Sequence, residues 1–140
     1  MHTLTLTETF PATPARLFSA WTDAGMLKRW FAPGDARVAE ASSDLRAGGR
    51  YRIVMEMSNG ERVAVGGEYR EIVANERLTF TWRWEHGEDT TLVEVAFRPA
   101  SAETTEMTLV HSQFKQSQDK DRHGQGWAGC LANLHATLTA

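Results

Sequence analysis

The sequence holds a single cysteine, Cys130, in 140 residues. One thiol forms no disulfide within the chain and has no cysteine partner for a zinc site. Positive charge is not in excess either, because 15 Lys and Arg stand against 18 Asp and Glu, a net charge of −3. The basic stripe typical of nucleic-acid binding is therefore missing. No hydrophobic run approaches the roughly 20 residues that cross a bilayer. These absences argue against a disulfide- or zinc-stabilised protein, a nucleic-acid-binding protein and a membrane-spanning protein.

The first ten residues, MHTLTLTETF, have neither a basic start nor a continuous apolar stretch. We therefore expect no secretory signal and a cytoplasmic location. There is no internal repeat, low-complexity tract or linker-like shift in composition, so residues 1–140 are expected to form a single domain. Five tryptophans are a heavy load of aromatic surface for this length, and they require a substantial core or a pocket.

The N-terminal third predicts a strand and two short helices. Apolar and threonine residues alternate over residues 4–10, which is typical of a half-buried strand. Thr13-Pro14 predicts a helix that begins with an N-cap and a first-turn proline. Thr22-Asp23 predicts the N-cap of a second helix, and Pro33-Gly34 predicts its end.

The middle of the chain alternates with period two and predicts a run of about six strands. Asn59-Gly60 predicts a hairpin turn, since both residues tolerate positive φ. Gly66-Gly67 indicates a bulge or a bend. The polar turn at residues 86–89 separates two further strands, and the last strand places three residues on one face: Met107, Leu109 and His111.

The C-terminal stretch changes to helical spacing, with steps of four, three and four between Trp127, Leu131, Leu134 and Leu138. Asp119 and Asp121 stand where the positive end of the helix dipole is expected. A strand, two short helices, a run of strands and one long helix predict an α+β fold. In that fold a curved antiparallel sheet wraps around the C-terminal helix.

Several motifs, read together, resemble one family over nearly the whole chain. They are FPATPARLF (10–18), WTD (21–23), LKRWFAP (27–33), GGRY (48–51), GEYREI (67–72), ERLTFTW (76–82) and GW (126–127). In this order they are similar to the activator-of-Hsp90-ATPase-homologue family of the START-like, or SRPBCC, superfamily. The resemblance implies a helix-grip fold whose C-terminal helix lies across the concave face of the sheet and encloses an apolar cavity. Relatives often carry Arg where this chain has Glu8, so no role of that cation is transferred.

Aromatic and methionine side chains on the predicted concave face are the main site candidates. Each taken singly is best explained as core packing, but a curved sheet closed by one helix leaves space for a small apolar molecule. Ala128, Gly129, Cys130 and Ala132 on the helix either permit close contact or leave a void. The predicted ligand-binding residues are Tyr51, Met55, Tyr69, Trp82, Trp84, Phe97, His111, Trp127, Leu131 and His135.

Among the polar candidates, His111 could orient a ligand or act as a general base. The alternative, which we favour, is a histidine satisfied by a neighbouring hydroxyl or carbonyl group. His86 and His123 are expected to be solvated. No metal-binding motif is present, and Cys130 has no basic neighbour in sequence to activate it. We therefore predict no catalytic residue, metal or cofactor.

Three functional hypotheses follow. The first is a domain that binds an apolar or amphipathic small molecule between the sheet and the C-terminal helix. The second is a protein-interaction module with a chaperone or other protein as partner, which requires an exposed patch outside the cavity. The third and least favoured is a cyclase-type enzyme, which requires an acid–base pair in the cavity, such as His111 with Glu8 or Tyr69. None of these hypotheses specifies the ligand or the oligomeric state.

Overall fold

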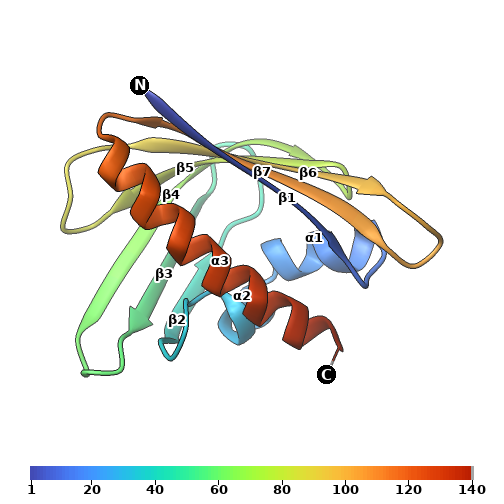
Figure 1. The fold of residues 1–140 in the computed structure, drawn as a ribbon, viewed down its shortest axis with the longest axis horizontal. Coiled ribbons are helices and arrows are strands. Elements are labelled where there is room, and N and C mark those ends of the chain that lie inside the picture. Colours follow the sequence, from blue (N-terminus) through green and yellow to red (C-terminus); the bar gives the residue numbers. More distant parts are fainter. Residues whose placement is uncertain (140) are drawn as a thin grey trace.

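The computed structural model describes residues 1–139, which form one seven-stranded antiparallel sheet and three helices (Figure 1). The strand order is β1-β7-β6-β5-β4-β3-β2. The long helix α3 crosses the concave face of the sheet, and α1 and α2 lie on the same side (Figure 1). The elements are β1 (His2–Phe10), α1 (Pro14–Thr22), α2 (Ala24–Trp30), β2 (Arg37–Ser43), β3 (Arg50–Glu56), β4 (Arg62–Val73), β5 (Arg77–Trp84), β6 (Thr91–Pro99), β7 (Thr105–Phe114) and α3 (Ser117–Thr139). The predicted helix-grip architecture is confirmed.

Both predicted helix caps are present. The Thr13 hydroxyl accepts a hydrogen bond from the Arg16 amide at 3.3 Å, and Pro14 occupies the first turn of α1. The Asp23 carboxylate accepts from the Met26 amide at 2.9 Å and begins α2. Each cap satisfies an amide that has no partner inside its own helix.

The hairpin predicted at Asn59-Gly60 is confirmed, but its geometry differs from the expected one. The Gly60 amide donates to the Met57 carbonyl at 2.9 Å, and only the glycine of the pair has positive φ, at 86°. This is a three-residue loop with glycine in the left-handed position. The bulge expected at Gly66-Gly67 is misplaced, because the β4–β5 register shifts between Tyr69 and Glu71.

Two local features of the sheet escaped prediction. Strand β2 has the sequence RVAEASS, with Val38 as its one buried residue, and it forms as an edge strand by pairing with β3. Near the end of β7, Gln113 has a φ of 73°. The residue that follows, Phe114, is buried with its ring centroid 4.3 Å from that of His111. The backbone irregularity thus turns Phe114 into the interior beside His111.

The inward stripe predicted for α3 is confirmed, since Trp127, Leu131, Leu134 and Leu138 are all buried. Gly129 lets the helix approach the loop after α2, because a Cβ atom there would lie 3.1 Å from Pro33 Cβ. Within the described residues, no helix is both long and apolar enough to cross a membrane. The assignment of residues 1–140 to one domain stays a prediction.

Candidate functional site

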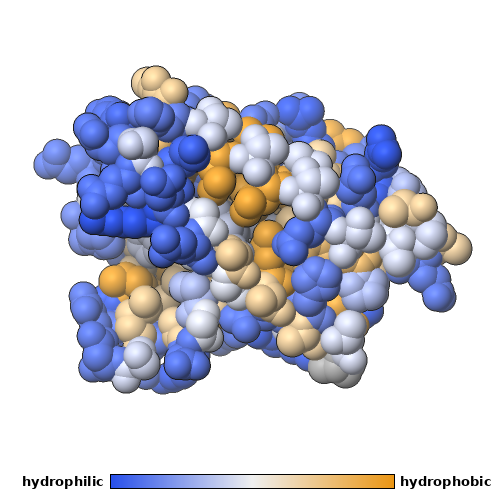
Figure 2. All heavy atoms as spheres, in the orientation of Figure 1, coloured by the Kyte–Doolittle hydropathy of each residue, from blue (hydrophilic) through white to orange (hydrophobic). Residues whose placement is uncertain are grey.

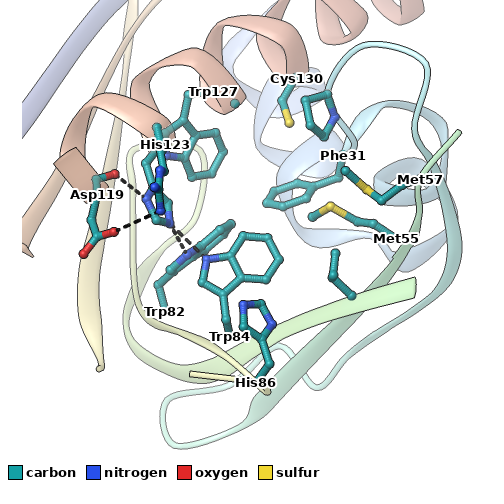
Figure 3. Close-up of a pocket in the computed structure, with 14 residues that line it drawn as sticks. Phe31, Met55, Met57, Trp82, Trp84, His86, Asp119, His123, Trp127 and Cys130 are labelled. Atoms are coloured by element: carbon teal, nitrogen blue, oxygen red, sulfur yellow. Dashed lines mark hydrogen bonds and ion pairs between the residues drawn. The ribbon is translucent and has the colours of Figure 1, made fainter. Parts of the chain in front are cut away.

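A cavity of about 360 Å³ lies between the first half of α3 and strands β3, β4 and β5 (Figure 3). The space-filling view shows a hollow here, between the polar surface over the start of α3 and the β3–β4 hairpin (Figure 2). Its lining is mostly aromatic, aliphatic and sulfur-containing. The lining residues are Phe31, Pro33, Met55, Met57, Val63, Trp82, Trp84, His86, Asp119, Arg122, His123, Gly126, Trp127 and Cys130.

His123 joins two tryptophans in the cavity wall (Figure 3). The indole N–H groups of Trp82 and Trp84 donate to His123 Nε2 at 3.3 Å and 3.0 Å. An atom that accepts two N–H groups carries no proton, so the proton of the neutral ring is on Nδ1. Nδ1–H donates to the Asp119 carbonyl oxygen at 2.7 Å, which fixes both the tautomer and the orientation of the ring.

His111 makes a second, fully buried network behind the wall. The Trp127 indole N–H donates to His111 Nδ1 at 3.0 Å, so the ring proton is on Nε2, which donates to Thr91 Oγ1 at 2.7 Å. The threonine hydroxyl in turn reaches the Trp82 carbonyl at 3.4 Å. Burial is the main cause that lowers the pKa of His111 to about 3, and the electrostatic influence of nearby His123 is a smaller one. His111 is therefore neutral at physiological pH, and the Thr91 hydroxyl is the kind of partner that the favoured alternative supposed.

The cavity has charged groups at its mouth and apolar groups within. Arg122, whose side chain is 68% exposed, lies 3.9 Å from the Asp119 carboxylate. His86 is exposed and packs against Trp84, with ring centroids 5.8 Å apart. Deeper in the wall, burial raises the pKa of the Cys130 thiol to about 12, so the thiol stays protonated. A buried protonated thiol is a poor nucleophile and behaves as a small apolar group.

Four of the ten predicted ligand-binding residues line the cavity: Met55, Trp82, Trp84 and Trp127. Tyr51 and Tyr69 point inward as predicted, but they pack with Phe80 further along the sheet. The Tyr51 hydroxyl donates to the Thr81 carbonyl at 2.6 Å, and the Tyr69 hydroxyl bonds Ser43 Oγ at 2.7 Å. Their polar groups thus have partners outside the cavity.

The other four predicted residues also lie away from the cavity lining. Phe97 packs edge-on against Phe18 of α1, with centroids 5.7 Å apart. His111 and Leu131 are buried in the core. His135 stacks on Phe10 at 4.2 Å near the surface and lies 3.9 Å from the Glu8 carboxylate.

Sequence reasoning missed His123, which was expected to be solvated and is half-buried in the wall. A signal for it exists: His123 stands four residues before Trp127, and residues four apart lie on the same face of a helix. Phe31 and Gly126 also line the cavity without having been predicted.

The arrangement offers little for acid–base chemistry. His111, Glu8 and Tyr69, the groups considered for a cyclase-type reaction, are not brought together in the cavity, since none of the three lines it. Within residues 1–139, no three His, Cys, Asp or Glu side chains lie close enough together to hold a metal ion. The chemistry that the lining supports is the burial of apolar surface.

A curved antiparallel sheet closed by a long C-terminal helix, with an apolar cavity between them, defines a helix-grip domain of the START-like class. The comparisons with known proteins agree. The family model described as activator of Hsp90 ATPase homolog 1-like protein matches residues 11–139. The chain belongs to this family, which confirms the resemblance seen in its motifs.

Solved structures share the fold over the full length of the chain. A protein from Silicibacter pomeroyi is 25% identical, with a TM-score of 0.89 over 99% of this chain and 98% of that one. A protein from Chromobacterium violaceum is 24% identical, with a TM-score of 0.89 over 100% and 99%. An Hsp90 activator from Plasmodium falciparum is 24% identical, with a TM-score of 0.78 over 99% and 97%. No curated protein gives a match.

Proposed function

We propose that this protein binds a small apolar molecule in the cavity between α3 and the sheet. The observation that carries the proposal is the cavity itself, about 360 Å³ of space walled by Phe31, Trp82, Trp84 and Trp127. Small-molecule sites are typically concave, mostly apolar and about 300–1,000 Å³ in volume. The cavity stands at the low end of that range, which favours a compact ligand over a long-chain lipid.

Tryptophan fluorescence tests the proposal, because three of the five tryptophans line the cavity. Titration with naphthalene, a compact two-ring probe, should change the emission saturably. The matched variants are Gly126→Leu and Ala128→Leu. Gly126 lines the cavity and a Cβ atom there meets nothing within 4 Å, so a leucine has room to occupy part of the cavity, whereas Ala128 is exposed and does not line it.

We expect Gly126→Leu to abolish the saturable change and Ala128→Leu to retain it. Equal binding by both variants would place the probe elsewhere on the molecule. If neither naphthalene nor a panel of compact apolar metabolites binds the unmodified protein, the proposal is wrong.

A second candidate is a protein-interaction role toward Hsp90, which the family description and the Plasmodium relative favour. Such a role needs an exposed docking surface, whereas the large apolar side chains exposed in residues 1–139 are Met1, Leu45 and Val73, from three different segments. Stimulation of Hsp90 ATPase turnover by the purified protein would support this role, and unchanged turnover would contradict it. The cytoplasmic location stays a prediction.

A further inference from the structure

The indole groups of the cavity wall, and the imidazoles that they contact, are already hydrogen-bonded. The walls include three indole N–H groups, and each donates to a histidine nitrogen: Trp82 and Trp84 to His123, and Trp127 to His111. An indole has no other polar atom. These three side chains therefore offer a ligand their aromatic carbon surface and no free hydrogen-bonding group.

His123 and His111 have no ring nitrogen free to bond a ligand. His123 Nε2 accepts two N–H groups, and its Nδ1–H is held by the Asp119 carbonyl. His111 uses both ring nitrogens, on Trp127 and Thr91. The remaining inner wall consists of Phe31, Pro33, methionines, Val63, Gly126 and the protonated thiol of Cys130.

We infer that the ligand is a neutral, compact aromatic molecule with no hydrogen-bonding group on its buried part. This inference rests on the proposed function and specifies the class of ligand for the same site. A hydroxyl, amine or carboxylate carried inside would lose its water without gaining a partner, which weakens binding roughly 5- to 150-fold. Planar apolar rings carry no polar group that must lose its water, and they can stack against the indoles and Phe31.

Among the described residues, the charged groups that line the cavity are Asp119 and Arg122 at its mouth, where the exposed imidazole of His86 also lies. Arg122 is mostly exposed, and it already lies near Asp119. An ion pair to such an exposed group contributes little. An anionic head group at the mouth would therefore add little affinity, which sets the predicted ligand apart from a fatty acid or other anionic amphiphile.

A series of naphthalenes tests the inference on the unmodified protein. In 2,6-dihydroxynaphthalene the hydroxyls are at opposite ends, so one enters the cavity in any end-on orientation. We expect naphthalene to bind at least roughly fivefold more tightly than the dihydroxy compound. 2-Naphthoate should bind more weakly than naphthalene, with no further loss in Arg122→Gln.

The variant His123→Leu makes the test specific to the network. It removes the acceptor of two indole N–H groups, which then become free to donate to a ligand oxygen. The preference for naphthalene over 2,6-dihydroxynaphthalene should shrink at least severalfold. His123→Gln, which keeps a side-chain acceptor, should retain the original preference, as should His135→Leu, which makes the same kind of change away from the cavity.

Indole N–H resonances in ¹⁵N-resolved NMR spectra keep the inference testable if His123→Leu fails to fold. With naphthalene bound, the indole N–H groups of Trp82 and Trp84 should keep the chemical shifts of hydrogen-bonded groups. Displacement of His123 by a ligand oxygen would contradict this.

Equal or tighter binding of the dihydroxy compound by the unmodified protein would overturn the ligand class while leaving the cavity as a binding site. Tight 2-naphthoate binding that depends on Arg122 would overturn it as well. A failure of the whole series to bind would instead count against the proposed function.

Discussion

At the scale of single residues, the protonation state of each interior histidine follows from the atoms around its ring. His111 accepts from an indole on one side and donates to a hydroxyl on the other, and it is fully buried. A second proton on this ring would need to displace the Trp127 N–H and would be far from water. The folded structure therefore requires the neutral form of His111, and protonation of the ring at low pH destabilises the fold.

This predicts a loss of stability on mild acidification. The pKa of His111 is about 3 in the folded protein and about 6.5 when unfolded. The unfolded chain therefore binds more protons between these values, and stability falls as pH decreases from 6.5 toward 3. His111 alone should lower the free energy of unfolding by about 1 kcal/mol between pH 6.5 and 5.5.

Urea unfolding at pH 7.5, 6.5 and 5.5 measures this effect, with His111→Gln as the control that lacks the titrating ring. The variant should be less stable at pH 7.5 but should lose less stability on acidification. Parallel pH profiles for the two proteins would show that His111 is not the group responsible.

At the scale of elements, local signals in the sequence predicted the ends of the short helices and the alternating strands. Thr13 and Asp23 act within their own turns, so their roles depend on neighbouring residues alone. Strand β2 has no such local signal, because it forms only by pairing with β3. The bulge near Tyr69 likewise depends on how β4 and β5 come into register, which no single segment encodes.

Two glycines of α3 should respond oppositely to the same substitution. At Gly126 a new Cβ atom meets nothing within 4 Å. Alanine there should therefore raise the free energy of unfolding by about 0.5–1 kcal/mol through its higher helix propensity. At Gly129 the new atom would lie 3.1–3.2 Å from Pro33 and the Gly34 amide nitrogen, so crowding should cancel or reverse that gain. Urea unfolding of Gly126→Ala and Gly129→Ala measures the contrast, and an equal gain in both would contradict the close approach of α3 to the loop.

At the scale of the whole molecule, the interior is filled under the second half of α3 and hollow under the first half. The helical period in the sequence predicted which residues point inward, and the family motifs predicted a cavity. Neither could distinguish Leu131, which is packed in the core, from Trp127, which lines the cavity. Both belong to one continuous stripe, and their surroundings depend on the curvature of seven strands and on the crossing of the helix.

A pair of alanine substitutions tests this division of the interior. Leu131 is buried and does not line the cavity, so Leu131→Ala should cost about 3–5 kcal/mol, in the upper part of the range for core leucines, and leave naphthalene affinity nearly unchanged. Met55 is equally buried but already has open space beside it. Met55→Ala should therefore cost about 2 kcal/mol, because fewer packing contacts are lost, while weakening naphthalene binding severalfold. Urea unfolding gives the free energy of unfolding of each variant, and fluorescence titration gives the naphthalene affinity of each. If Leu131→Ala instead weakened binding with little loss of stability, the cavity would have to extend to the second half of the helix.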